Sequence, residues 1–253
     1  MDLSAVIEDV HEDPHRERGF YEYPELYEFF QSRLVDRDAQ VGLLDRFVPP
    51  GASRVLEFGC GAGPLLVRIE DEYEEVLGVD SNEAMLELAR RRVTTADVLE
   101  ADFTDWSAAE EDRVFDVAAL MGGLLHLRAD RDLESFAENA YASLRPGGVF
   151  VTFFEPLSAS VTNGSRDVRS VGSERYTVER HATSALTSGS GHYTTTYCFV
   201  ITDEEEATEA RMGTVFQGRL FTPERLRGAF SAAGFEGIEI VDGDDPAVLH
   251  ARK

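Results

Sequence analysis

Short apolar runs alternate with segments of helical periodicity between residues 53 and 154. Five runs have the composition of buried strands: residues 54–58, 75–80, 97–103, 115–127 and 149–154. Three intervening segments carry apolar side chains at helical spacing: residues 64–73, 81–92 and 130–144. This alternation predicts an α/β fold, a Rossmann-like, doubly wound and mostly parallel sheet that binds its ligand at the carboxyl ends of the strands.

The hydrophobic pattern changes after Pro156. Three β-like runs follow, and they predict an antiparallel meander inserted into the α/β pattern: residues 176–184, 192–201 and 212–221. Alternation places four side chains on one face of the middle run: Tyr193, Thr195, Tyr197 and Phe199. A helix at 222–234, with Thr222 as its cap and Gly234 as its stop, then precedes a closing strand pair. This pair, at 236–241 and 247–252, would complete a seven-stranded sheet.

We therefore expect a single domain that has four parts along the chain. They are an N-terminal helical cap (1–40), a ligand-binding core (41–155), an antiparallel insertion on the substrate side (156–221) and a final helix with a strand pair (222–253).

Charge and cysteine content narrow the partners and the compartment. The 48 acidic residues exceed the 24 basic ones, giving a net charge of −24, and Lys253 is the only lysine. Such an acidic, lysine-poor chain resembles haloarchaeal proteins, in which salt screens self-repulsion, so we expect a halophilic protein. The sequence has no stripe of basic residues of the kind that binds nucleic acid, and it has no apolar run long enough to cross a membrane. Two unpaired cysteines and the absence of a signal-peptide pattern favour the cytoplasm.

A glycine-rich turn carries the first chemical signal. The segment VLEFGCGAGPLL (55–66) places Gly59, Gly61 and Gly63 between a strand and a helix. Pro64 occupies the position of the third glycine in a dinucleotide fingerprint, and Glu57 precedes the first glycine. A carboxylate here would repel a pyrophosphate but attract an ammonium group, so the turn suits an adenosine that carries an amino acid.

The segments around this turn resemble the class I S-adenosylmethionine-dependent methyltransferases over about residues 50–155. VLEFGCGAG is similar to their first motif, and FDVAAL and LRPGGVFV are similar to later ones. The resemblance implies that Asp80 accepts from both ribose hydroxyls and that Asp102 and Phe103 flank the adenine. It implies S-adenosylmethionine as the cofactor, no metal, and twelve cofactor-binding residues: Tyr27, Glu57, Gly59, Cys60, Gly61, Gly63, Asp80, Ser81, Met85, Asp102, Phe103 and Met121.

Three further positions narrow the resemblance to enzymes that act on small molecules. Tyr27 in a PELYE segment, His126 after the fourth strand and Glu155 in an EP pair after the fifth match the N,N-dimethyltransferases of deoxyamino sugars. The resemblance implies in-line methyl transfer to a small-molecule amine, with these three residues as the catalytic candidates. The segment QSRLVDRDAQ departs from that pattern because it lacks an expected lysine, and the meander sequence diverges.

Other functions remain open on the sequence alone. The chain could be an O- or C-methyltransferase of a small metabolite, with His126 as the base. It could also be a non-catalytic S-adenosylmethionine-binding module that regulates a partner. The tetrapeptide MGGL after the fourth strand is unlike the NPPY-type segment used on planar amines of bases. The protein could assemble as a homodimer.

Overall fold

The computed structural model describes residues 1–157, 164–187, 189–241 and 247–253. The chain forms two compact units, each made of two chain segments. One unit is Met1–Asp36 with Val161–Gly218, and the other is Arg37–Ser160 with Arg219–Lys253. The single-domain organisation expected above stays a prediction.

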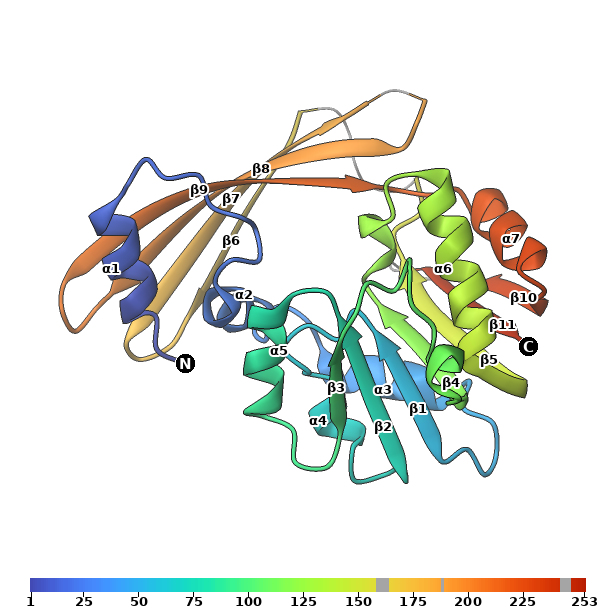
Figure 1. Cartoon of the computed structure of the whole chain (residues 1–253). Helices are drawn as coiled ribbons and strands as arrows, with labels where there is room; N and C mark the ends of the chain where they lie inside the picture. Colours follow the sequence, from blue (N-terminus) through green and yellow to red (C-terminus); the bar gives the residue numbers. More distant parts are fainter. Residues whose placement is uncertain (158–163, 188, 242–246) are drawn as a thin grey trace. The chain divides into compact units, whose positions relative to one another are not determined.

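The larger unit contains a seven-stranded sheet in the order β10-β11-β5-β4-β1-β2-β3 (Figure 1). Strands β1 to β5 are parallel to one another, and β11 is antiparallel to both β5 and β10. This arrangement confirms the predicted fold class. The strands are β1 (Arg54–Phe58), β2 (Glu75–Asp80), β3 (Asp97–Glu100), β4 (Phe115–Met121), β5 (Leu144–Phe154), β10 (Glu236–Val241) and β11 (Ala247–Arg252).

Alternate side chains of the strands enter two cores, one on each face of this sheet. In β1, Leu56 and Phe58 join a core with α6 and α7, whereas Val55 joins a core with α3, α4 and α5. Both faces are therefore covered by helices, as a parallel sheet requires. The helices are α3 (Arg37–Asp45), α4 (Leu66–Ile69), α5 (Glu83–Arg90), α6 (Asp130–Ser143) and α7 (Pro223–Ala232), with 3₁₀ turns η1 (Ala108–Glu111) and η2 (Leu124–His126).

Capping residues set the helix starts, and several strands, among them β3, β4 and β5, have other bounds than the sequence predicted. Asn82 caps α5 by accepting from the Met85 N–H at 3.1 Å, and Thr222 caps α7 in the same manner. The fourth strand was expected to run to residue 127, but β4 ends at Met121. Gly122 has a φ of +94°, which turns the chain out of the sheet and into η2. The helix expected at 64–73 is only the four residues of α4.

The smaller unit contains an antiparallel sheet in the order β6-β7-β8-β9. Its elements are β6 (Ser165–Gly172), β7 (Tyr176–Leu186), β8 (His192–Asp203), β9 (Thr208–Arg219), α1 (Ser4–Glu12) and α2 (Pro24–Gln31). Both helices contribute to a core with the strands, in which Phe29 and Phe30 meet Val178 and Ile201. The meander prediction is confirmed in kind but wrong in number, because β6 is a fourth strand.

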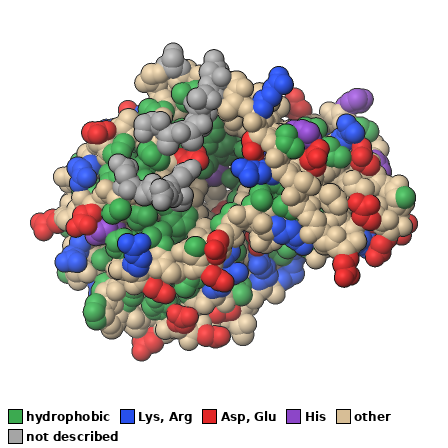
Figure 2. Space-filling model, turned by 180° about the vertical axis from the view of Figure 1, so that it is seen from behind, with side chains coloured by type: hydrophobic (Ala, Val, Ile, Leu, Met, Phe, Trp, Pro, Cys, Tyr) green, Lys and Arg blue, Asp and Glu red, His purple; other side chains and the backbone are tan. Residues whose placement is uncertain are grey.

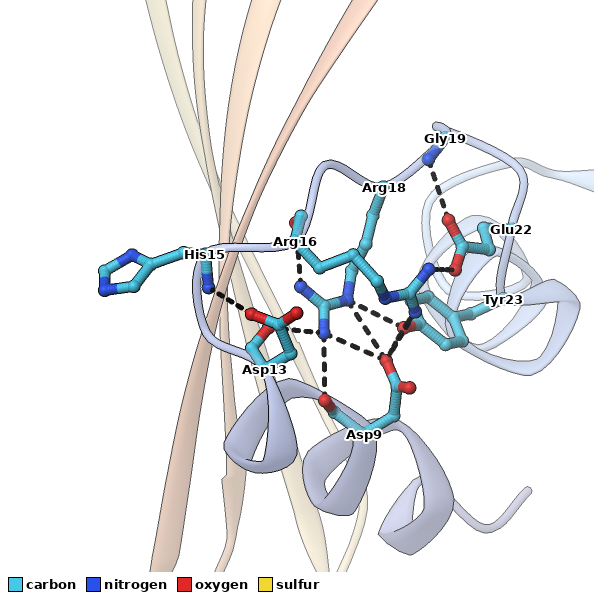
Figure 3. Close-up of polar contacts among 8 residues, drawn as sticks. All are labelled: Asp9, Asp13, His15, Arg16, Arg18, Gly19, Glu22 and Tyr23. Atoms are coloured by element: carbon cyan, nitrogen blue, oxygen red, sulfur yellow. Dashed lines mark hydrogen bonds and ion pairs between the residues drawn. The ribbon is translucent and has the colours of Figure 1, made fainter.

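A polar network holds the segment between α1 and α2 (Figure 3). The Arg18 guanidinium is buried and donates to the Asp9 carboxylate and to backbone carbonyls of Asp9, Asp13 and Arg16. The Tyr23 hydroxyl donates to the same Asp9 carboxylate. Because the buried cation is fully paired, the network fixes the start of α2 without leaving an unsatisfied charge.

Acidic side chains are spread over the surface and interspersed with arginines on the face shown in Figure 2. Many arginines are in ion pairs, such as Arg225 with Glu134 at 2.6 Å and Arg54 with Glu75 at 2.5 Å. Among the described residues, none of the helices has both the length and the apolar character that crossing a membrane requires.

Candidate functional site

The glycine turn follows β1 at the carboxyl edge of the sheet in the larger unit. Gly59, Gly61 and Gly63 have φ values of +63°, +53° and +67°, which side chains rarely adopt. A Cβ at Gly59 would lie 3.4 Å from Leu120 and 3.7 Å from Phe103, whereas a Cβ at Gly61 would meet nothing within 4 Å. The turn therefore packs closely on one side and leaves open space for a ligand at Gly61.

Glu57 is a buried acid and the penultimate residue of β1. Its side chain is 3% exposed, and Oε2 has no hydrogen-bond partner among the described residues. Burial raises the pKa of Glu57 to about 8 against the lowering effect of Arg37, and the nearby Asp80 contributes to the rise. A buried acceptor without a donor is costly, so this oxygen is suited to a cationic ligand group.

Asp80 ends β2 and braces the glycine turn. Its Oδ2 accepts from the Gly61 N–H at 2.8 Å, and its Oδ1 accepts from the Asn82 N–H at 2.9 Å. Burial raises the pKa of Asp80, and these backbone hydrogen bonds oppose that rise. Each carboxylate oxygen retains a second lone pair, so the side chain can still accept from a diol.

Asp102 and Phe103 follow β3. Asp102 is exposed, and one of its oxygens accepts from the backbone N–H and the hydroxyl of Thr104 at 2.8 and 2.7 Å. The Phe103 ring packs edge-on against Phe136 at a centroid distance of 5.3 Å. Because a Cβ at Gly59 would approach Phe103, the phenyl ring and the glycine turn are neighbours.

Four other predicted cofactor residues differ in their accessibility. Ser81 is exposed directly after Asp80, and Met121 is half-buried at the end of β4. Met85 is 2% exposed in α5, and Cys60 is 3% exposed within the turn. The Cys60 thiol lies under β2, since a Cβ at Gly78 would come within 2.8 Å of its sulfur. The two exposed or half-buried side chains can touch a ligand, while the two buried ones contribute to the core.

A cavity of about 160 Å³ lies after the carboxyl ends of β4 and β5. Its walls are mostly apolar, with one carboxylate and one guanidinium: Gly122, Leu124, Leu125, Phe153, Phe154, Glu155, Arg219, Leu220 and Phe221. Arg219 is held by Asp130 at 2.8 Å and lies 4.9 Å from the centre of the Phe221 ring. The cavity can therefore enclose a small, largely apolar molecule that carries a charged group.

His126 belongs to η2, the turn that supplies two leucines to this cavity, but its own side chain is exposed and outside the lining. Protein packed around the imidazole removes part of its hydration, although the residue as a whole reaches the surface; this lowers the pKa of His126 below its usual value, and the positive Arg128 adds to the effect. The imidazole is consequently neutral at pH 7, and the lowered pKa makes it a weaker proton acceptor than an ordinary imidazole.

Tyr27, the third catalytic candidate, belongs to the smaller unit. It lies in α2 with its ring centroid 5.0 Å from that of Tyr21 and 6.0 Å from that of Phe20. A role beside the methionyl group stays a prediction.

Two polar residues of the larger unit were missed from the sequence. Arg219 of the cavity lies in the run QGRLF, where its apolar neighbours were interpreted only as strand. Arg37 begins α3 in the segment that had been noted only for lacking a lysine, and it acts on the charge of Glu57. No motif in the sequence marked either arginine.

The family model described as "Methyltransferase domain" matches residues 55–148. This range begins in β1 and ends in β5, so it contains the glycine turn, Asp80, Asp102 and the turn η2.

Two curated relatives methylate amino sugars according to their names. The chain is 32% identical over 135 residues to a dTDP-4-amino-2,3,4,6-tetradeoxy-D-glucose N,N-dimethyltransferase of Saccharopolyspora spinosa, covering 51% of this chain and 53% of that one. It is 28% identical over 212 residues to a dTDP-3-amino-3,6-dideoxy-alpha-D-glucopyranose N,N-dimethyltransferase of Streptomyces fradiae, covering 81% and 78%. The chain thus spans about half the length of the first of these relatives.

A solved structure shares the fold. An S-adenosylmethionine-bound amino pentose methyltransferase from Micromonospora echinaspora superposes with a TM-score of 0.79 at 23% identity, over 94% of this chain and 99% of that one. The chain therefore matches the methyltransferase domain model over residues 55–148 and shares its fold with a solved methyltransferase.

Proposed function

We propose that this protein transfers a methyl group from S-adenosylmethionine to the amine of a small molecule, with an amino sugar as the acceptor class. The observation that carries the proposal is the cavity after β4 and β5. It lies at the same edge of the sheet as the glycine turn, and its walls are apolar apart from Glu155 and Arg219. Such walls suit a deoxygenated sugar ring, and Glu155 suits its ammonium form.

The residues of the glycine turn fit the two ends of the cofactor. Glu57 would bind the methionyl ammonium through its unpaired buried oxygen, and Asp80 would accept from the ribose hydroxyls. Asp102 and Phe103 would hold the adenine, one by accepting from its amine and the other by ring contact. Bound S-adenosylmethionine supplies an electrophilic methyl group on a sulfonium.

The protein must then position a neutral amine and exclude water, which together can contribute about 7–11 kcal/mol to the lowering of the barrier. His126 is neutral at pH 7 and would take the proton that the amine loses. Glu155 would attract the protonated amine before this transfer. Tyr27 would contact the methionyl group, Ser81 and Met121 would contact the cofactor, and the buried Met85 and Cys60 would pack behind the cofactor pocket.

The test is methyl transfer to matched acceptors. Purified protein is incubated with S-adenosylmethionine and either an amino deoxysugar nucleotide or the same compound with a hydroxyl in place of the amine. We expect S-adenosylhomocysteine and a product heavier by one or two methyl groups only with the amine. Methylation of the hydroxyl compound would favour the O-methyltransferase alternative. Binding without turnover on any acceptor would favour the regulatory module.

His126→Ala should lower turnover by about 10²–10⁴-fold because it removes the proton acceptor. Affinity for S-adenosylhomocysteine, measured by calorimetry, should be unchanged. His15→Ala is the matched control, because its imidazole points away from the other labelled side chains in Figure 3 and the residue belongs to the other unit. Equal turnover in the His126 and His15 variants would remove His126 from the mechanism.

The net charge of −24 supports a halophilic protein of haloarchaeal origin. Raising KCl from 0.1 to 2 M should raise the melting temperature by about 5–10 °C, because salt screens the repulsion between carboxylates. Differential scanning calorimetry measures this shift, and a constant or falling melting temperature would contradict the proposal. Cytoplasmic location, a homodimeric assembly and the lack of nucleic-acid partners remain predictions from the sequence.

A further inference from the structure

The turn η2, which carries His126, is joined to β4 through two adjacent glycines. Gly122 has a φ of +94°, which favours glycine, and a Cβ at Gly123 would collide with the Leu120 side chain. The turn itself is three residues long, and the His126 N–H donates to the Gly123 carbonyl at 3.0 Å. Because glycine leaves the backbone more freedom than other residues do, contacts that follow the turn have the larger part in fixing its position.

Arg219 makes such contacts just after the turn. Its Nη1 donates to the Arg128 carbonyl at 3.3 Å and pairs with the Asp130 carboxylate at 2.8 Å. The carbonyl belongs to the second residue after His126, and Asp130 is the first residue of α6. The Arg219 side chain is only 14% exposed, so the packing around it restricts the directions in which the guanidinium can point.

The backbone near Arg219 is anchored beside the end of β5. Phe221 forms a parallel bridge with Pro156, and its carbonyl accepts from the Leu157 N–H at 3.2 Å. These two residues directly follow Glu155, which lines the cavity together with Arg219. The Phe221 ring centre lies 4.9 Å from the guanidinium carbon, a distance at which a cation and an aromatic ring attract each other. Arg219 therefore connects the β5 side of the cavity with the chain that follows η2.

Asp130 is held by a second arginine, which separates the role of Arg219 from that of a general stabilising ion pair. Arg225 of α7 donates from Nε to Asp130 at 3.2 Å and from Nη2 to Glu134 at 2.6 Å. Among the described residues, Arg225 is outside the lining of the cavity. Without Arg219, the start of α6 would thus keep an ionic partner, whereas the Arg128 carbonyl would lose its contact with the cavity wall.

We propose that Arg219 is a positioning residue that holds η2, and with it His126, at the cavity. This inference rests on the proposed function, in which His126 takes the proton of the amine, and it gives the last residue of β9 a part in the reaction. The ion pair with Asp130 orients the guanidinium, and the hydrogen bond to the Arg128 carbonyl fixes the chain just after the imidazole. Because a misplacement of about 1 Å can lower a rate by about 10²-fold, loss of this contact should affect turnover more than binding.

The experiment is a double-mutant cycle between Arg219 and His126. Methyl transfer from S-adenosylmethionine to the amino deoxysugar nucleotide is followed for the wild type, Arg219→Met, His126→Ala and the double variant. Arg219→Met should lower kcat by about 10–100-fold and change KM for the amine by less than about threefold. In the His126→Ala background, the same substitution should lower kcat by less than about threefold, because Arg219 acts through the imidazole. Equal losses in the two backgrounds would overturn the inference, as would an unchanged kcat in Arg219→Met.

Arg225→Met is the matched control, because it removes the same charge and the other arginine partner of Asp130 without touching the cavity. Its kcat should stay within about twofold of the wild type. Calorimetry with S-adenosylhomocysteine identifies the variants that fold, which should bind it as tightly as the wild type. If Arg219→Met fails to fold, Arg219→Lys takes its place in the cycle, and its kcat should fall at least about threefold because the shorter side chain cannot keep both contacts. A wild type that does not methylate the amine would overturn the proposed function itself.

Discussion

Replacing Asp80 with alanine should weaken binding of S-adenosylhomocysteine by about 10²–10⁴-fold. The side chain has two functions in the proposed complex. It accepts from the backbone N–H groups of Gly61 and Asn82, and it would accept from the ribose hydroxyls. Hydrogen bonds to a charged group contribute about 1.5–3 kcal/mol each, and the loss of two gives the expected range.

Calorimetry measures this loss, and Asp105→Ala is its control. Asp105 is an exposed acid shortly after β3, so its removal changes the net charge by the same amount without touching the turn. Comparable affinities for the Asp80 and Asp105 variants would mean that the turn does not bind adenosine. Asp80→Asn should fall between wild type and alanine, because the amide keeps one acceptor oxygen.

Glu57→Gln should abolish proton release when the cofactor binds. The pKa of Glu57 is raised to about 8 by burial and by Asp80, while Arg37 opposes the rise. The Cys60 thiol lies nearby. At pH 6.5 the free protein therefore holds a proton on Glu57, and an incoming ammonium group would expel it. Calorimetry of S-adenosylhomocysteine binding in two buffers of different ionisation enthalpy should report about one proton released by the wild type and none by Glu57→Gln.

The same substitution has a defined effect on stability. Because the pKa of folded Glu57 exceeds the ordinary value of 4.5, the folded state holds the extra proton. The free energy of unfolding should thus fall as pH rises from about 4.5 to 8, by up to about 1.4 kcal/mol per pH unit. Glu57→Gln should lose this contribution, whereas Glu87→Gln, an exposed control in α5, should retain it. Identical denaturation curves across this range would show that Glu57 ionises normally.

The sheet of the larger unit could be predicted from sequence because its central strands β1, β2 and β4 are short and buried on both faces. β2, β10 and β11 have the predicted limits, since polar or glycine-containing segments bound them clearly. β6 could not be predicted in this way. It is a mostly exposed edge strand in which only Val171 is buried, so SRDVRSVG has no alternation to detect.

The candidate site divides along similar lines. Residues within a contiguous motif, such as Glu57 and the three glycines, are recognisable because their spacing reflects one turn. Arg37 and Arg219 carry no such pattern, since a single charged residue is as common on any exposed helix or strand. Their relevance comes from tertiary neighbours, namely the unpaired oxygen of Glu57 for one and the apolar walls of the cavity for the other.

Each compact unit combines two segments that are far apart in the sequence, and this imposes an order on folding during synthesis. Helices α1 and α2 leave the ribosome long before the antiparallel strands whose core they complete. The larger sheet also waits, because β11, which lies between β5 and β10, is the last strand made. Their contacts are therefore far apart in sequence, which slows folding and leaves apolar helix faces exposed in the nascent chain. Removing residues 1–36 would expose the same core permanently.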